Sequence, residues 1–437
     1  MRNSTLRFRG IGGTLVAFAV LSAACTGAGT PTTAPSAPGA SASAAASAAP
    51  SSEPTASLSG TTVTVWTMED ATKFEALIKP FEDTTGVTVD VEAVPWDNVN
   101  EKLTTAVASG DGPDVTQVGL SLLPTFTAAG ALEDLKPYLA DHATLDDATF
   151  LDAVAADKLS TDGTMPSLPW VADTRVLFYR TDIFTEVGLS GPPTTWAEFT
   201  AAAEKLAARG SGQFGYYIPQ WDAPLPIQFT WQAGGDVVAA DGTINLDTPE
   251  FRKAVDLYTS FYEKKLVPTA SDFDQTAGFI SGAAPMLISG PYLAAGIKEQ
   301  APELDGKWAV ATLPKDVAGT ALFAGSNLAV WKGSDNVDGA LALLDYLSQP
   351  ATQVAWFTAT SQLPTNKVAA TDPAVTGDPN LEVYAQQLGD AKLLPLVPAW
   401  DKVSAEILKA LNEIVLNGAD KETTLTQLNQ TVAALQP

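Results

Sequence analysis

The sequence predicts an α/β protein built as two lobes. Two stretches support this prediction, because expected strands alternate with expected helices from residue 62 onward and again from residue 175 onward. Such alternation is typical of βαβ units, so we expect a mostly parallel sheet. The hydrophobic fraction of 46% is ordinary for a globular chain, and 437 residues suffice for about two to three domain-sized units.

The first block begins with Thr62-Val63-Thr64-Val65-Trp66-Thr67, where polar and apolar residues alternate as in a strand. Further strands are expected over residues 86–91 and 115–118. Helices are expected between them over residues 71–82 and 98–109, the second ending at Gly110. Each strand except the last is therefore followed by a helix, as in successive βα units.

The second block opens with an expected strand over residues 175–179. Thr195-Trp196-Ala197-Glu198 matches a capping box and begins a helix that runs through Ala208. Asp247-Thr248-Pro249-Glu250 begins another helix, with proline near its first turn. Beyond it we expect a buried strand over residues 285–288 and amphipathic helices over residues 338–347 and 402–416.

The first 60 residues are expected to lie outside the fold. Residues 1–24 carry three arginines, no acid and a short apolar run, which is the pattern of a secretory signal peptide. The alternative is an N-terminal membrane anchor, but the apolar run is shorter than the roughly 20 residues that a span needs. Removing this segment changes the net charge from -25 to -28.

Cys25 is the only cysteine, and Leu21-Ser22-Ala23-Ala24 before it resembles a bacterial lipobox with its leucine one place early. We expect lipid at Cys25, because this cysteine stands where a lipobox places the lipidated residue. Several acyl chains would then attach the protein stably to a membrane. The alternative is secretion with an incidental thiol. Residues 25–60 are thus expected to be the lipidated cysteine and a disordered tether, since Ala, Ser, Thr, Pro and Gly dominate there and cannot form a core.

The composition excludes several classes of function. One cysteine permits no internal disulfide and no thiolate metal cluster, and one histidine argues against a zinc or iron site. An excess of 25 acids argues against nucleic-acid binding. No P-loop, dinucleotide fingerprint or GxSxG elbow occurs, and His142 is expected to be solvated in a polar loop. We expect no cofactor and no metal, while paired carboxylates for glycoside hydrolysis stay open.

Tryptophans and acids follow one another at several points where strands or loops end. The pairs are Trp66 with Glu69-Asp70, Trp221 with Asp222, Trp231 with Asp236, and Trp400 with Asp401. A sugar offers an apolar C–H face to a ring and hydroxyls to carboxylates, amides or arginine. The alternative for any single tryptophan is packing in the core, which we assign to Trp170, Trp196, Trp308 and Trp331.

Six stretches of the globular part occur in the same order in one known family. They are residues 63–66, residues 81–89, residues 102–131 with Ser109-Gly110-Asp111-Gly112-Pro113-Asp114-Val115, residues 177–182 with 192–196, residues 288–292 and residues 311–314. With these motifs the chain resembles the extracellular solute-binding proteins that feed ABC importers, carbohydrate-binding family 1, which includes the maltodextrin-binding protein. The resemblance implies a two-lobe periplasmic-binding-protein fold of type II with a multi-crossing hinge.

The resemblance also implies where a ligand binds. Asp70 corresponds to a carboxylate that accepts sugar hydroxyls, Asp173 to a carboxylate at the crossover, and Trp400 to a stacking tryptophan. Tyr292 stands in place of a second stacking tryptophan, and Ser121 in place of an acid. With the neighbouring tryptophans and polar residues, the expected ligand-binding residues are Trp66, Glu69, Asp70, Ser121, Asp173, Arg175, Trp221, Asp222, Trp231, Asp236, Tyr292 and Trp400.

The resemblance implies that residues 61–171 with 315–358 form the N-lobe and residues 172–314 with 359–437 the C-lobe. We expect a monomeric, lipid-anchored extracytoplasmic protein that closes on a sugar and delivers it to the transmembrane subunits of an ABC permease. A polyol, a glycerol phosphate or a non-sugar ligand is an alternative within the family. Alternatives from other classes are a sugar-binding sensor or adhesin lipoprotein and a surface glycoside hydrolase.

Overall fold

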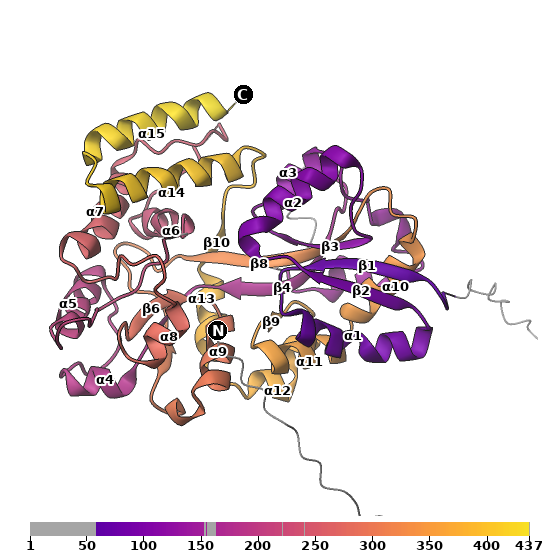
Figure 1. The fold of residues 1–437 in the computed structure, drawn as a ribbon, viewed down its shortest axis with the longest axis horizontal. Coiled ribbons are helices and arrows are strands. Elements are labelled where there is room, and N and C mark those ends of the chain that lie inside the picture. The colour runs from indigo at the N-terminus through magenta and orange to yellow at the C-terminus, as the bar shows by residue number, and fades with distance from the viewer. Residues whose placement is uncertain (1–57, 153, 155–162, 221, 240, 437) are drawn as a thin grey trace, which may run out of the picture. The chain divides into compact units, whose positions relative to one another are not determined.

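The expected α/β class is confirmed by a computed structural model that describes residues 58–152, 154, 163–220, 222–239 and 241–436. Residues 57–437 form one compact unit by themselves. Its described part contains two β-sheets with helices around them (Figure 1). The expected signal peptide, tether and Cys25 lie outside the described residues.

The first sheet has the strand order β2-β1-β3-β8-β4-β9, with β10 paired to β8. Its strands are β1 (Thr62–Thr67), β2 (Thr88–Ala93), β3 (Val115–Gly119), β4 (Leu168–Thr174), β8 (Ala321–Val330), β9 (Leu363–Pro364) and β10 (Ala391–Leu393). The second sheet has the order β6-β5-β7. Its strands are β5 (Val176–Tyr179), β6 (Met286–Ser289) and β7 (Ala309–Ala311).

The prediction of a mostly parallel sheet is wrong. Strand β1 pairs in parallel with β2 and β3, and β10 pairs in parallel with β8. However, β8 runs antiparallel to both β3 and β4, and the second sheet is antiparallel between all its described strands. Local βα spacing predicts the parallel part correctly, whereas β8 comes from about 200 residues further along the chain and enters between β3 and β4 from the other sheet.

The chain passes directly from one sheet to the other at Arg175. Strand β4 ends at Thr174 in the first sheet, and β5 begins at Val176 in the second. The return runs from β7 to β8. Arg175 is therefore placed where the two sheets meet, which determines its role in the cavity described below.

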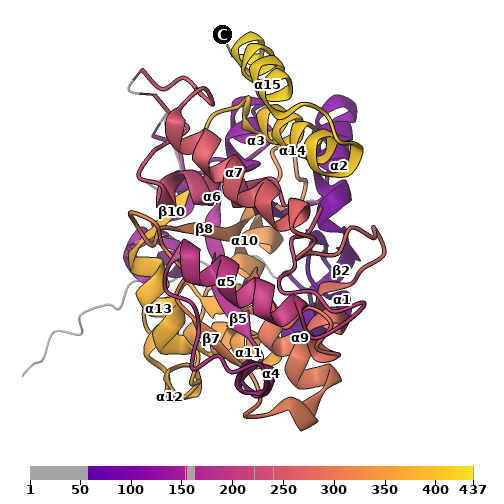
Figure 2. The ribbon, with the colours of Figure 1, turned by 90° about the vertical axis from the view of Figure 1, so that its left-hand side faces the viewer.

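The α-helices surround these sheets (Figures 1 and 2). Those before β6 are α1 (Ala71–Thr85), α2 (Trp96–Ser109), α3 (Leu123–Ala128), α4 (Thr181–Glu186), α5 (Trp196–Ala207), α6 (Pro224–Gln232), α7 (Pro249–Glu263) and α8 (Gln275–Ile280). Those after it are α9 (Tyr292–Gln300), α10 (Val337–Leu347), α11 (Pro350–Thr360), α12 (Pro373–Thr376), α13 (Leu381–Gly389), α14 (Trp400–Asn417) and α15 (Lys421–Leu435).

Short 3-10 helices connect several of these elements. They are η1 (Lys136–Tyr138), η2 (Ala143–Leu145), η3 (Asp147–Thr149), η5 (Pro302–Leu304) and η6 (Ala369–Thr371). Helix α14 packs against α15 and α7, and Figure 1 shows α14 and α15 running alongside each other. In α6 every residue from Leu225 to Gln232 is buried, because this helix packs against both α7 and β8.

Local sequence signals position several elements as expected. Strand β1 has the expected bounds, and α2 ends at Gly110, whose φ of 75° is left-handed and is readily adopted by glycine. Thr195 caps α5 by accepting from the backbone N–H of Glu198. The Glu198 carboxylate turns to the N–H and hydroxyl of Thr194, so the reciprocal bond is displaced by one residue.

Of the tryptophans assigned to packing, Trp170, Trp196 and Trp331 are buried, while Trp308 is partly buried and stacks on Phe178 with ring centroids 5.8 Å apart. Trp170 lies on β4 and Trp356 on α11, with ring centroids 5.6 Å apart, and Phe74 of α1 meets both rings edge-on. Trp331 is likewise buried, and Trp196 donates its indole N–H to Gln232 at 2.8 Å. These rings join elements from distant parts of the sequence, which agrees with a core role.

The prediction of a solvated His142 is wrong. Its side chain is 22% exposed, and its Nδ1 contacts the carboxylate of Asp345 on α10. Asp345 also accepts from the Thr144 hydroxyl. The local sequence is polar as expected, but α10 folds back over this loop and covers the ring.

Two negative findings concern only the described residues. Within them no helix combines the length and apolar character that crossing a bilayer requires. No group of three His, Cys, Asp or Glu side chains in these ranges could hold a metal ion.

Candidate functional site

A cavity of about 560 Å³ lies where the two sheets meet. Its lining comes from strands of the first sheet and from segments next to the second, since Gly119 ends β3, Phe323 lies on β8, Arg175 joins the sheets and Tyr292 opens the helix after β6. The lining contains both polar and apolar side chains. Among the described residues, its lining is Glu69, Trp96, Asp97, Gly119, Leu120, Ser121, Asp173, Arg175, Pro224, Gln275, Tyr292, Leu322, Phe323, Ala324, Gly325, Ser326, Gln362, Leu393, Leu394 and Leu396.

One part of the cavity wall, which we call the amide side, consists of Glu69, Ser326 and Gln362, together with Gln117, which hydrogen-bonds to Glu69 and Ser326 without lining the cavity. The Glu69 carboxylate accepts from the side-chain amides of Gln117 and Gln362, each at 2.9 Å. Gln117 also donates to the Ser326 hydroxyl at 2.7 Å. The orientation of Gln117 is determined by its oxygen, which accepts from the Thr67 hydroxyl and from a backbone N–H.

Burial raises the pKa of Glu69, against the opposing effect of its amide donors Gln117 and Gln362. The anion is thus held by neutral dipoles, and the nearby Asp173 carboxylate also raises its pKa. Such a carboxylate keeps lone pairs for a ligand hydroxyl, because two oxygens offer about four acceptor positions.

Another part of the wall, which we call the ionic side, consists of Asp173, Arg175 and Tyr292, together with Asp222, which influences Arg175 without lining the cavity. The guanidinium of Arg175 donates to Asp173 Oδ2 at 2.5 Å, with the two side chains 18% and 14% exposed. The same guanidinium lies 5.8 Å from the centroid of the Tyr292 ring. Asp173 Oδ1 is buried and has no hydrogen-bond donor in the described part of the chain.

Charge and burial oppose each other on the ionic side. Burial raises the pKa of Asp173 although Arg175 lowers it, and burial raises the pKa of Asp222 to about 6 against the effect of Arg175 and a backbone N–H. Burial would lower the pKa of Arg175, but the carboxylates of Asp173 and Asp222 outweigh it and hold that pKa above its ordinary value. Arg175 is therefore a permanent cation between two buried carboxyl groups.

Two glycines leave room for this arrangement. A Cβ on Gly290 would lie 2.6 Å from Asp173 Oδ1 and 2.7 Å from Arg175 Nη1. A Cβ on Gly119 would lie 2.9 Å from the ring of Trp96. Glycine at these positions lets the ion pair and the indole pack directly against backbone.

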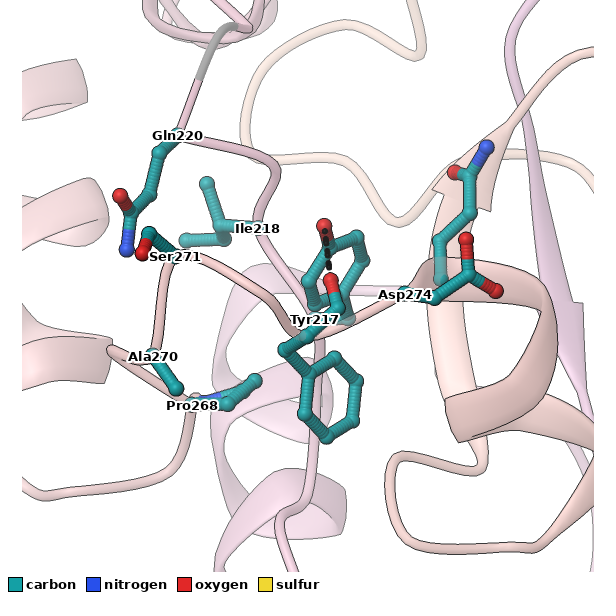
Figure 3. Close-up of a pocket in the computed structure, with 9 residues that line it drawn as sticks. Tyr217, Ile218, Gln220, Pro268, Ala270, Ser271 and Asp274 are labelled. Carbon is teal, nitrogen blue, oxygen red and sulfur yellow. Dashed lines mark hydrogen bonds between the residues drawn. The ribbon is translucent and has the colours of Figure 1, made fainter. Parts of the chain in front are cut away.

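A second, smaller pocket of about 200 Å³ adjoins the cavity through Gln275, which lines both. Figure 3 shows Tyr217, Gln220, Ser271 and Asp274 around it, and the Tyr217 hydroxyl donates to the backbone oxygen of Phe273 at 3.2 Å. Its walls come from two segments, residues 217–220 and residues 268–275.

The sequence of this chain matches the family described as bacterial extracellular solute-binding protein over residues 66–354. The chain belongs to that family. A putative binding protein of Brucella abortus is 28% identical over 374 residues, which cover 83% of this chain and 90% of that one. The diacetylchitobiose binding protein DasA of Streptomyces coelicolor is 26% identical over 357 residues, covering 79% and 82% respectively.

The fold of this solute-binding protein agrees with the comparison. The solved structure of the sugar-binding protein MalE from Xanthomonas citri is 30% identical, with a TM-score of 0.73 and coverage of 86% of this chain and 97% of that one. The expected family is thereby confirmed, as is the two-lobe periplasmic-binding-protein fold.

The structure of the solute-binding protein brings together five of the expected ligand-binding residues. Glu69, Ser121, Asp173, Arg175 and Tyr292 all line the cavity. Asp222 does not line it, but its charge acts on Arg175 from behind. Trp221 lies outside the described residues.

Two further expected residues, Asp70 and Trp66, do not line the cavity. Asp70 is exposed and caps α1 by accepting from the backbone N–H of Lys73 at 3.1 Å. The ring of Trp66 faces the Lys102 ammonium, which lies 4.0 Å from its centroid. Trp66 lies near the end of β1 and Asp70 follows this strand, as expected. However, the Asp70 side chain caps α1, and the Trp66 ring contacts Lys102 of α2.

Three more expected residues, Trp231, Asp236 and Trp400, also have contacts outside the cavity lining. Trp231 is buried and donates its indole N–H to Asp236 at 3.2 Å, while Asp236 also pairs with Lys392 at 3.2 Å. Trp400 opens α14 and is 1% exposed. None of these three lines the cavity, so the proposed stacking by Trp400 stays a prediction that its burial does not favour.

The most exposed lining ring was missed from the sequence. Trp96 is 49% exposed and, with Asp97, begins α2 at the end of β2. The signal was present, because an aromatic residue beside an acid after a strand is the same pattern as Trp66 with Glu69. Gln117 and Gln362 carried no comparable signal, because a single glutamine in a strand or a loop does not predict a ligand-binding site.

Proposed function

We propose that this protein binds a sugar between its two lobes and delivers it to an ABC import permease. The observation that supports this best is the composition of the cavity, in which Trp96, Tyr292 and Phe323 offer apolar faces beside carboxylates, amides and a guanidinium. A sugar requires this combination of ring contact and rim hydrogen bonds. Its volume of about 560 Å³ falls in the ordinary range of ligand pockets, roughly 300 to 1,000 Å³.

The similar proteins support the sugar assignment. One is named a sugar-binding protein and another a diacetylchitobiose binding protein. Each similar protein reported above is named for binding rather than for catalysis. We therefore propose a binder that returns its ligand unchanged, with no glycoside hydrolysis.

Closure and anchoring complete the proposal. The amide side belongs to the first sheet and its connections, whereas Tyr292 follows the second sheet. A ligand that contacts both would stabilise the closed arrangement of the lobes, which the permease would recognise. Lipid on Cys25 would keep the binder near the permease and raise its local concentration. The lobe boundaries given above remain predictions.

A titration of the purified protein against neutral mono- and oligosaccharides tests the binding step. Indole fluorescence reports on all ten tryptophans, the half-exposed Trp96 at the cavity among them, and thermal unfolding reports on the whole fold. A bound sugar stabilises the native state by about 2.7 kcal/mol when its concentration is 100 times Kd. Recovery of intact sugar separates binding from hydrolysis, and no response to any sugar would remove the assignment.

Delivery and anchoring need separate measurements in cells. Deleting the gene should abolish uptake of the radiolabelled sugar that binds best, whereas a sensor or adhesin would leave uptake unchanged. Cys25→Ala should move the protein from the membrane fraction to the medium. Persistence of the C25A protein in membranes would contradict lipid attachment at this cysteine.

A further inference from the structure

The charged groups that line the cavity are unequal in sign. Glu69, Asp97 and Asp173 are acids, and Arg175 is the one base among the described lining residues. Asp222 adds a carboxyl group within range of Arg175. A ligand in this cavity therefore meets more negative than positive charge.

The positive charge of Arg175 is already engaged. It donates to Asp173 at 2.5 Å, is influenced by Asp222 and packs toward the Tyr292 ring. An anionic ligand would have to compete with the Asp173 carboxylate for the same guanidinium. Asp173 would in turn lose its counter-charge while still buried, which costs free energy.

Nearby lysines do not restore the balance. Lys102 pairs with Glu92 and covers Trp66, and Lys73 bridges to Glu299 at 3.1 Å. Lys392 pairs with Asp236. Each of these ammonium groups is held by an acid or a ring that does not line the cavity.

We propose that this cavity selects its ligands by charge, so that a sugar with a protonated amine binds more tightly than its neutral parent and a sugar carboxylate is rejected. The inference rests on the proposed sugar-binding function and specifies its substrate class. Charges at contact distance interact strongly where water is partly excluded, because the effective dielectric constant is low. Even with screening, the preference for amine over carboxylate should reach about tenfold in Kd.

The experiment compares three forms of one sugar at pH 7. The reference is the neutral sugar that binds most tightly in the panel, and the probes are its 2-amino-2-deoxy and 6-uronic acid analogues. For glucose these are glucosamine and glucuronic acid. The expected order of affinity is amine, neutral, carboxylate by calorimetry, and the spread should shrink as salt is raised.

Asp97→Asn tests the charge itself with little risk to folding, because Asp97 is exposed at the start of α2. The variant should reduce the ratio between amine and carboxylate affinities by about threefold, as expected for one partly screened charge. The matched control is Glu101→Gln, an exposed acid on the same helix outside the lining. It changes the net charge equally and should leave the ratio unchanged.

The outcomes separate the two proposals. A uronic acid that binds as tightly as its neutral parent, or an amine that binds no better than the uronic acid, would overturn charge selection while sugar binding stands. An equal effect of D97N and E101Q would also overturn it, because the selectivity would then come from the overall charge. Failure of every neutral sugar to bind would instead refute the proposed function.

Discussion

The two walls of the cavity keep a buried carboxylate in different ways. On the amide side Glu69 receives two neutral amide donors, Gln117 and Gln362. On the ionic side Asp173 receives one guanidinium and keeps an oxygen for which the described residues supply no donor. Burial raises the pKa of both acids, so neither arrangement fully replaces water.

The two sides differ in what holds their carboxylates in place. The amide side belongs to a connected hydrogen-bond network in which Gln117 uses both its oxygen and its nitrogen. The ionic side lies at the crossing between the sheets, where Arg175 holds carboxyl groups that would otherwise repel. We infer that the amide side orients a ligand, whereas the ionic side depends on one cation for its stability.

The largest expected effect comes from removing that cation. Arg175→Met should lower the free energy of unfolding by about 3 to 5 kcal/mol at pH 7, because Asp173 and Asp222 would be left as unpaired buried anions. The loss should diminish toward pH 4 as both carboxyl groups are protonated. Urea denaturation at both pH values measures this. A loss below about 1 kcal/mol at pH 7 would show that the pair is not a stability element.

Removing the charge of Asp222 should have the next largest effect, and it should raise the free energy of unfolding instead of lowering it. Its folded pKa of about 6 exceeds the ordinary 3.8, so its ionised form destabilises the native state. The free energy of unfolding should therefore fall as pH rises from about 4 to 6. Asp222→Asn should remove this decline and stabilise the protein by at most about 3 kcal/mol above pH 6. The wild type and D222N should coincide near pH 4, and a constant difference across that range would contradict the assignment.

Replacing Trp96 should change the affinity for a ligand rather than the stability of the fold. Because it is half exposed at the cavity, Trp96→Ala should weaken binding of the best sugar by about 1 to 2 kcal/mol and change unfolding little. The matched variant Trp400→Ala removes a buried ring and should lower the free energy of unfolding by about 3 to 5 kcal/mol. If W400A instead weakens binding with no loss of stability, Trp400 stacks on the ligand as the resemblance implied.

The smallest expected effect is on the amide side. Glu69→Gln keeps one acceptor oxygen but turns an amide N–H toward Gln117 or Gln362, so about 1 kcal/mol of stability should be lost at pH 7. The loss is limited because neutral glutamine is easier to bury than the carboxylate. Thermal unfolding against Glu101→Gln as control measures it. A loss as large as that of R175M would show that the two walls do not differ as described.

Much of the fold followed from local sequence patterns. Alternation predicted β1 with its observed bounds, Gly110 ended α2, and Thr195 capped α5. These signals act within a few residues of chain. The antiparallel insertion of β8 between β3 and β4 had no such signal, because strand pairing across about 150 to 200 residues leaves no periodicity in either segment.

The site was predictable where a residue's position along a strand decides its place. Glu69 and Ser121 follow β1 and β3, and the carboxyl ends of parallel strands share one edge. Choosing among tryptophans was less secure, since Trp96 and Trp400 each stand beside an acid and each opens a helix. Only packing distinguishes the half-exposed ring from the buried one.

The sequence by itself determined the α/β class, the family and a set of polar and aromatic residues suited to a sugar. It did so because secondary structure and family motifs are encoded in short spacings. The tertiary structure alone decided which carboxylate meets which donor, that Arg175 is occupied by Asp173, and that Gln117 and Gln362 both hold Glu69. Burial and electrostatics depend on what covers a side chain, and here the covering groups come from strands and loops far apart along the chain.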